Sequence, residues 1–150
     1  MAENLAYKEK EGCWAYNDNE DNSKINGFLY DWKTAKKVCP SGWHLPSDSE
    51  WEKLVNHLGG ETQAGAKLKT KYTEGDDNSN ASNETGFRAL LAGYFDEQNY
   101  IGFNHTGIWC SSSTSRKLFA KSFSVQKSSK YVSSYSETKG IRYSVRCIKD

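Results

Sequence analysis

The chain has 150 residues, of which 36% are hydrophobic and 13% aromatic; this composition is typical of one folded domain spanning residues 1–150 and excludes a disordered chain. No run of about 18 apolar residues occurs and the first residues are polar, so we expect neither a membrane span nor an export signal within this sequence. The formal net charge is only +1 and no nucleic-acid-binding motif is recognisable, so we expect no nucleic-acid partner.

The first predicted helix begins after Asp31. An Asp at this position is a good N-cap, because its carboxylate accepts the free amides of the first turn. Trp32, Ala35 and Val38 follow at helical spacing and form one apolar side. We expect this helix to end before Pro40.

The second predicted helix spans residues 47–57. Ser47 and Glu50 form a capping box, in which each side chain accepts an amide of the other residue. The Gly pair 59–60 ends the helix. The apolar stripe of this helix has the i, i+3, i+4, i+7 pattern and consists of Trp51, Leu54, Val55 and Leu58.

The pattern then changes to short apolar runs separated by Gly, Asn, Asp and Ser. Residues 74–85 are predicted to form an exposed loop. Strands are predicted at 87–91, 107–111, 118–125 and 143–148. The predicted fold class is therefore α+β, with two helices in the N-terminal half and a twisted antiparallel sheet with long irregular loops.

Charge is distributed unevenly along the chain. Residues 1–106 carry 11 Lys and Arg against 17 Asp and Glu, whereas residues 107–149 carry 9 against one. Twelve of the 18 Ser lie between Ser111 and Ser144, mixed with Tyr; Tyr gives rigid contact area and Ser gives adaptable hydrogen bonds. This last third is predicted to form a recognition surface that attracts anionic partners. Two alternatives remain open. The acidic part of the chain neutralises the basic last third across the fold, or the last third is an exposed polar region without a binding role.

Four cysteines, at positions 13, 39, 110 and 147, are spaced too widely for a CxxC metal or redox motif. Their even number favours two disulfides in an oxidising compartment, with four buried thiols as the alternative. Spacing alone leaves all three pairings open.

Catalytic and metal chemistry have weak signals. The three histidines lack metal-ligand spacing, and no phosphate-binding glycine loop occurs, so we expect no metal and no cofactor. The oxygen-rich segments 17–21 and 76–78 lack the pattern of an EF-hand and are interpreted as solvated loops. His105 lies five residues before Cys110 and is a candidate base for a cysteine nucleophile, but a structural cysteine is the favoured interpretation and no catalytic residue is assigned.

Five segments carry a family signature. They are GFLYDW (27–32), CPSGWHLPSDSEW (39–51), GFRAL with a following GY (86–94), WCSS (109–112) and YSVRC (143–147). In order and spacing they resemble the Fibrobacter succinogenes major paralogous domain family over almost the whole chain. The segment 39–51 is the most specific, and its Trp and Pro residues are interpreted as structural.

The resemblance implies a fold related to C-type lectins and formylglycine-generating enzymes, in which the chain termini pair as strands and an irregular segment displays a ligand surface. It also implies a secreted or cell-surface location in Bacteroidetes and similar bacteria. The biochemical role of such domains is mostly uncharacterised, and we predict a non-enzymatic binding role for this one. Similar domains serve as variable proteins of diversity-generating retroelements, whose diversified region corresponds to residues 109–146 here. The family pattern favours a Cys39–Cys147 disulfide, which leaves Cys13 to pair with Cys110.

Composition and place in the family pattern together predict the ligand contacts in the last third of the chain. The partner is predicted to be a protein or glycan, with an anionic one favoured. The predicted contact residues are Ser113, Ser115, Arg116, Lys117, Lys121, Ser128, Ser129, Lys130, Tyr131, Ser133 and Tyr135.

Two other functions are retained as alternatives. The first is an enzyme related to the cysteine-dependent formylglycine-generating oxidases, although no segment matches their active-site pattern. The second is a calcium-dependent carbohydrate-binding module, although the Glu-Pro-Asn, Gln-Pro-Asp and Trp-Asn-Asp motifs of sugar-binding lectins are absent from the sequence.

Overall fold

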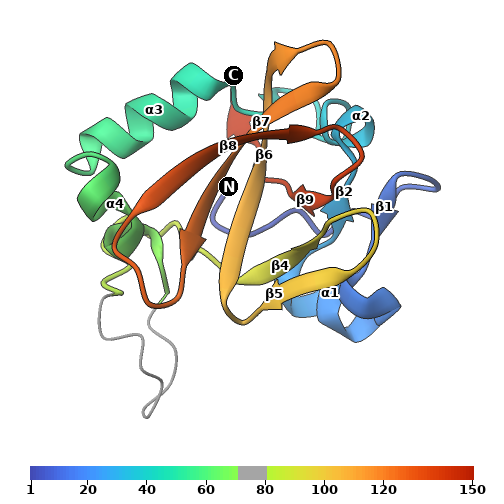
Figure 1. Ribbon diagram of the computed structural model, residues 1–150, viewed down its shortest axis with the longest axis horizontal. Coiled ribbons are helices and arrows are strands. Elements are labelled where there is room, and N and C mark those ends of the chain that lie inside the picture. Colours follow the sequence, from blue (N-terminus) through green and yellow to red (C-terminus); the bar gives the residue numbers. More distant parts are fainter. Residues whose placement is uncertain (71–80) are drawn as a thin grey trace.

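The structure is a computed structural model that describes residues 1–70 and 81–150. The described residues form an α+β fold in which four α-helices and a single 3-10 turn surround a curled, mixed sheet (Figure 1). In chain order the elements are β1 (Cys13–Trp14), η1 (Tyr16–Asp18), α1 (Glu20–Asn26), β2 (Leu29–Tyr30), α2 (Trp32–Ala35), β3 (Trp43–His44), α3 (Asp48–His57), α4 (Glu61–Leu68), β4 (Ala92–Phe95), β5 (Tyr100–Phe103), β6 (Thr106–Arg116), β7 (Phe119–Gln126), β8 (Val132–Thr138), β9 (Tyr143–Ser144) and β10 (Ile148–Lys149).

Helix α3 confirms the prediction from the capping box. The Ser47 Oγ accepts the amide of Glu50 at 3.3 Å, and a Glu50 carboxylate oxygen accepts the amide of Ser47 at 2.8 Å. Trp51 and Val55 are buried. Gly60 then acts as the N-cap of α4, with a φ of 86° that favours glycine.

The N-cap of α2 is also as predicted, because Asp31 Oδ1 accepts the amide of Thr34 at 2.8 Å. The helix itself has only one α-turn and then tightens, with Lys37 donating to the Thr34 carbonyl. Helices α1 and α4 were not predicted. Helix α1 has cap signals in Asn19 and Gly27, but only one of its residues is buried, so it lacks an apolar stripe; α4 starts without a side-chain cap and contains Gly65.

The sheet is mixed, which corrects the antiparallel prediction. Strand β6 pairs antiparallel with β7 and parallel with both β4 and β9. Two successive chain reversals, from β4 to β5 and from β5 to β6, return the chain to its original direction, so β6 runs parallel to β4. Strand β8 extends the sheet beyond β7, and β10 pairs separately with β3.

The predicted strand 107–111 lies within β6, and the predicted strand 118–125 is confirmed except for residue 118, which precedes β7. Residues 87–91 form only an isolated bridge between Ala89 and Lys69, and the strand begins at Ala92 instead. The predicted strand 143–148 divides into β9 and β10, because the Val145 carbonyl between them accepts the amide of Leu5. Strand β8 was not predicted, and residues 74–80 of the predicted loop lie outside the described residues.

Alternation along β6 divides the core into two clusters. Ile108 and Cys110 point into one cluster with Phe28, Tyr30 and Tyr143, because alternate residues of a strand face opposite sides of the sheet. Trp109 points into the other cluster, where it packs against Trp51 of α3 with ring centroids 6.2 Å apart. Helices α3 and α4 therefore cover one face of the sheet formed by β6, β7 and β8 (Figure 1).

The disulfide links Cys39 to Cys147, as the family pattern implied. Cys13 and Cys110 are free thiols, so the second predicted pairing is wrong. The strand order β1-β2-β9-β6 separates these two cysteines by three inter-strand spacings, or about 14 Å, whereas a disulfide needs Cα atoms within about 7 Å.

A buried polar network holds the two ends of the chain together. The Asn4 Oδ1 accepts the Trp109 indole N–H and the Arg146 Nε–H, each at 2.8 Å. The Arg146 guanidinium also donates to the carbonyls of Phe87 and Arg88. The Arg of the YSVRC segment is therefore structural.

Candidate ligand-binding site

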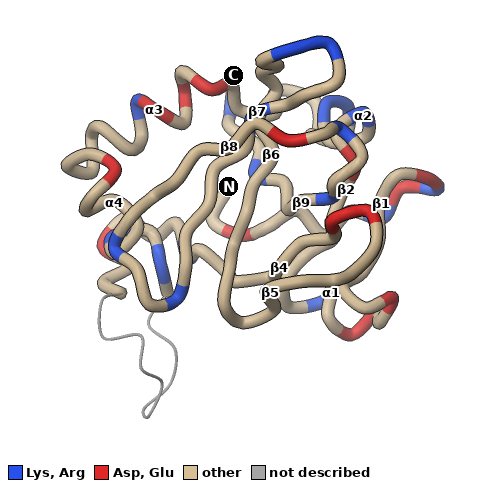
Figure 2. Tube along the Cα trace, viewed as in Figure 1, with Lys and Arg blue, Asp and Glu red and all other residues tan. Residues whose placement is uncertain are grey.

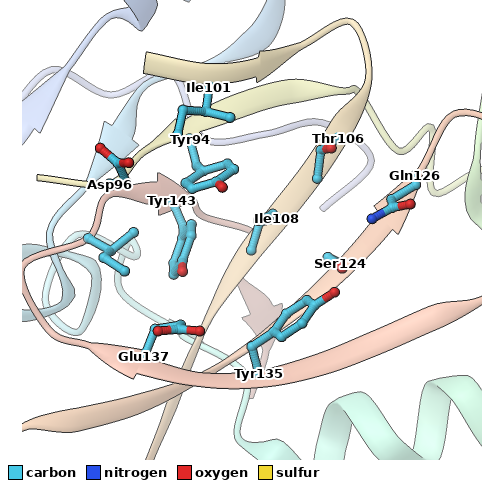
Figure 3. A pocket seen from close by; sticks show the side chains of 11 residues that line it. Tyr94, Asp96, Ile101, Thr106, Ile108, Ser124, Gln126, Tyr135, Glu137 and Tyr143 are labelled. Carbon is cyan, nitrogen blue, oxygen red and sulfur yellow. The ribbon is translucent and has the colours of Figure 1, made fainter. Parts of the chain in front are cut away.

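An open hollow of about 430 Å³ lies on the face of β6, β7 and β8 opposite α3 and α4 (Figure 3). We call it the tyrosine hollow. Its volume is within the range of small-ligand sites. Its lining residues are Tyr94, Asp96, Ile101, Thr106, Ile108, Ser124, Gln126, Tyr135, Glu137, Ile141 and Tyr143.

The lining follows from strand periodicity. The strands β6, β7 and β8 contribute residues 106 and 108, 124 and 126, and 135 and 137, each two positions apart. Residues two apart on a strand face the same side of a sheet. Tyr94 of β4 and Tyr143 of β9 complete the floor, because both strands pair with the opposite edge of β6.

Three tyrosines give the hollow its aromatic character. The rings of Tyr94 and Tyr143 have centroids 6.0 Å apart and are tilted by 46°, and Figure 3 shows both in the middle of the hollow. Tyr135 of β8 is 40% exposed. Burial raises the pKa of Tyr94, and the charges of Asp96 and Glu137 raise it further. The Tyr94 phenol is therefore neutral at ordinary pH.

Two carboxylates lie at one end of the hollow in the view of Figure 3. Asp96 accepts the amides of Gln98 at 2.9 Å and Asn99 at 2.7 Å, and these bonds lower the pKa of its carboxyl. Glu137 is half-buried and forms no ion pair with any described residue. Among the lining residues of the hollow, all of which are described, none is Lys, Arg or His.

The neighbouring cations are held by other groups. The Arg142 guanidinium lies over the rings of Trp14 at 3.5 Å and Phe95 at 4.2 Å. The Lys139 Nζ donates to the carbonyl of Lys117 at 2.8 Å and lies over the ring of Trp32. The hollow therefore carries negative charge, from Asp96 in the acidic part of the chain and from Glu137 in the basic last third.

The predicted contact residues do not gather into one patch. They separate into four groups, three of them outside the hollow, and Figure 2 shows the basic residues of the turns at opposite ends of the strands. Ser115, Arg116 and Lys117 lie at the β6–β7 turn; Ser128, Ser129, Lys130 and Tyr131 lie at the β7–β8 turn; Ser113 and Lys121 lie beside Asp48 of α3; Ser133 and Tyr135 lie on the face of the hollow.

Two of these residues have structural contacts. The Ser113 Oγ accepts the amide of Asp48 at 2.9 Å, which caps the first turn of α3, and Lys121 Nζ lies 3.9 Å from the Asp48 carboxylate. A register shift between Cys110 and Thr114 in β6 turns this part of the strand toward α3. As ligand contacts, the eleven residues remain a prediction.

Sequence reasoning missed most of the lining. Tyr94, Asp96 and Ile101 come from β4, the following turn and β5, which lie outside the Ser-rich region. Their meeting with Tyr135 and Glu137 depends on the parallel pairing of β4 with β6, which no local pattern signals. Tyr143 and Glu137 lie within the Ser-rich stretch, and Tyr143 also begins the YSVRC segment, but neither was among the predicted contact residues.

The structure does not bring the candidate cysteine and its base together. Cys110 is 2% exposed, and burial raises its pKa to about 12. His105 is exposed just before β6, and five residues of extended chain span about 16 Å. A thiolate nucleophile therefore has neither a base nor access at this position.

Within residues 1–70 and 81–150, no three His, Cys, Asp or Glu side chains are grouped to hold a metal ion. In the segment 17–21, Asp18 accepts the Tyr100 hydroxyl at 2.6 Å, Asn19 caps α1, and Glu20 and Asp21 pair with lysines. The other oxygen-rich segment, 76–78, lies outside the described residues.

Comparison with known proteins gives one match. A family model described as Fibrobacter succinogenes major domain matches residues 1–149. No curated protein and no solved structure matches the chain. In the part of the chain that the structure describes, no helix is both long and apolar enough to cross a membrane.

Proposed function

The chain belongs to the Fibrobacter succinogenes major domain family, and from this premise we propose that it is a non-enzymatic domain that binds its ligand in the tyrosine hollow. The observation that carries the proposal is the composition of this hollow. Three tyrosines, two carboxylates and the polar side chains of Ser124 and Gln126 converge on one open volume. A concave site with a few convergent polar groups is the usual form of a small-ligand site.

The rigidity of the surrounding scaffold supports this function. Tyr143 lies a few residues before Arg146 and Cys147. Arg146 donates a hydrogen bond to the buried Asn4, and Cys147 is bonded to Cys39, so a hydrogen bond and a disulfide both hold the chain beside Tyr143. The lining residues of β6 and β7 lie on long paired strands. A site built on strands needs little ordering when the ligand binds.

We further propose a C-type lectin-like arrangement and a secreted or cell-surface location. The support for the fold is the approach of the two termini, since Leu5 donates to the Val145 carbonyl and the N-terminal amine to the Cys147 carbonyl. The support for the location is the disulfide, which persists in oxidising compartments.

More specifically, we propose that the domain is a variable recognition protein of the kind that occurs with diversity-generating retroelements. Along β8, the side chains of Ser134, Tyr135 and Ser136 are exposed while the strand stays paired through its backbone. Exposed positions on a fixed strand tolerate exchange, because substitutions there rarely change stability by more than about 0.5 kcal/mol.

We propose that the predicted anionic partner binds outside the hollow. The lysines and arginine of the β6–β7 and β7–β8 turns (Figure 2) are its candidate contacts, whereas the charged residues that line the hollow are two carboxylates. We therefore assign the ligand of the hollow separately from any polyanion that contacts the turns.

An array of glycans and cell-surface proteins tests the proposed function. The wild-type domain is compared with the Tyr135→Ala/Glu137→Gln double variant, which alters the hollow. Tyr7→Ala is the matched control, because Tyr7 is 59% exposed, lies outside the hollow and is not a predicted contact residue. We expect the double variant to lose the bound features and the control to keep them. Bound features that survive in the double variant, or an array that the wild type leaves empty, would contradict the proposal.

A further inference from the structure

On the basis of the proposed function of the hollow, we propose that its ligand is an organic ammonium group, either a small amine or a lysine side chain of a partner protein. Three aromatic rings, two carboxylates and the absence of any lining cation carry this assignment within the described residues. The proposed function leaves the chemical class of the ligand open, and this proposal names it.

The two carboxylates that line the hollow give it a negative potential. Asp96 is held ionised by two backbone amides, and Glu137 has no ion-pair partner among the described residues. Both contribute to raising the pKa of Tyr94, so their negative potential reaches the floor of the hollow. An anionic ligand would be repelled there, whereas a cation would supply the missing counter-charge.

The aromatic rings favour the same charge. The face of a tyrosine ring is negative and attracts an ammonium placed within about 6 Å of its centroid. Tyr94 and Tyr143 are already arranged 6.0 Å apart at a tilt of 46°, and Tyr135 is 40% exposed. Because rings with centroids 6.0 Å apart already touch, an ammonium would lie against the open side of this pair, where Tyr135 and Glu137 also line the hollow.

A cation–π contact within the protein already occurs close to the hollow. The Arg142 guanidinium lies over Trp14 and Phe95, and Phe95 precedes Asp96 directly in the chain. The apolar side chains of Ile101, Ile108 and Ile141 in the hollow suit the aliphatic part of an amine. A sugar would find hydrogen-bond partners here, but it would leave both negative charges without a counter-charge.

Calorimetric titration with two matched pairs of probes tests the inference. The first pair is choline and 3,3-dimethylbutan-1-ol, in which a neutral carbon replaces the charged nitrogen. The second pair is Nα-acetyl-lysinamide and its Nε-acetylated form. We expect each cation to bind with a dissociation constant of about 1 mM or lower, and at least about tenfold more tightly than its neutral counterpart. Preference for choline indicates a small amine, and preference for the lysine derivative indicates a partner protein.

Variants connect the binding to the hollow. Glu137→Gln keeps the shape of the side chain and removes its charge, and we expect it to weaken binding of the cations about fivefold or more without affecting the neutral probes. Tyr7→Ala, outside the hollow, should leave both affinities unchanged. Thermal melting of each variant checks that the fold is intact; if Glu137→Gln fails to fold, Asp96→Asn serves instead.

The outcomes separate the two proposals. Equal affinity for charged and neutral probes, or an affinity for cations that Glu137→Gln leaves unchanged, would overturn the ammonium assignment. If neutral probes bind and Tyr135→Ala abolishes their binding, the hollow is a ligand site but not one for cations. If no probe binds, the ammonium assignment is wrong, and the array experiment alone decides whether the hollow is a site.

Discussion

The ammonium of Lys69 and the carbonyl of Ser129, sixty positions apart in the chain, lie 2.6 Å apart. The same Nζ donates to the carbonyls of Gln126 at 3.0 Å and Lys127 at 2.7 Å, and Lys69 is fully buried. One side chain thereby fixes the β7–β8 turn. Because Gln126 lines the tyrosine hollow, Lys69 also positions one end of the proposed site.

Substitution of Lys69 by Met should therefore be strongly destabilising. Met keeps the apolar stem but removes the three hydrogen bonds that the Nζ donates to the turn. The Gln126 carbonyl still accepts the amide of Ser129, and a buried carbonyl that does lose its donor costs about 1–3 kcal/mol when water does not replace it. We expect the free energy of unfolding to fall by about 2–4 kcal/mol. Lys67→Met is the control, since Lys67 is paired with Glu84 at the surface and should change stability by less than about 1 kcal/mol. Urea denaturation of both variants measures the difference, and equal effects would contradict this role of Lys69.

The single disulfide predicts a defined thiol count. Labelling of the unreduced, denatured protein should modify two cysteines, Cys13 and Cys110, and labelling after reduction should modify four. The bond closes a separation of 108 residues, for which chain entropy gives about 4–5 kcal/mol as an upper value. Reduction should therefore lower the free energy of unfolding by several kcal/mol, and Cys13→Ser by less than about 1 kcal/mol. No labelled thiol before reduction would disprove this disulfide pattern.

Glu50 predicts a dependence of stability on acid pH. Bonds from the amide and hydroxyl of Ser47, together with His44, lower the pKa of this carboxyl to about 2 from an ordinary 4.5. A carboxyl whose pKa is lowered by folding stabilises the protein above its unfolded pKa, and this contribution is lost as the pH falls from 4.5 toward 2. Glu50→Gln should flatten the stability profile in that window, whereas Glu52→Gln, exposed on the same helix, should not. Melting temperatures between pH 2 and pH 5 give the profiles; parallel curves for wild type and Glu50→Gln would contradict the prediction.

Gly65 tests two opposing effects on α4. Alanine is a better helix former by about 1 kcal/mol, which alone would stabilise the protein. A Cβ at this position, however, would lie 2.5 Å from the Tyr131 carbonyl and 2.7 Å from the Lys130 carbonyl, which are backbone atoms of the β7–β8 turn. We expect the clash to dominate and Gly65→Ala to destabilise by about 1–3 kcal/mol. Gln63→Ala on the same helix should be nearly neutral, and a stabilised Gly65→Ala variant would show that α4 does not approach the turn this closely.

The parts of the fold that were predicted correctly depend on neighbours in the sequence. The capping box of Ser47 and Glu50, the N-cap Asp31 and the short apolar run at residues 107–111 act within a few residues, so the sequence alone reveals them. The Cys39–Cys147 bond required the family pattern, because spacing left three pairings open.

The candidate site was less predictable for a physical reason. Tyr94 reaches Tyr143 only because β4 and β9 pair with the same edge of β6, and such long-range pairing leaves no periodic trace in the sequence. The charge of the last third predicted a basic binding face, but cation–π contacts hold Arg142 and Lys139 elsewhere. The charged residues that line the hollow are instead the carboxylates Asp96 and Glu137.

The most direct test of the ammonium site is an NMR titration of the labelled protein with choline and with Nα-acetyl-lysinamide. The account predicts that the ring signals of Tyr94, Tyr135 and Tyr143 shift together along one binding curve, while those of Tyr131 stay in place. Shifts confined to Tyr131 and the basic turns, or no shift of the three hollow rings at about 50 mM probe, would contradict it.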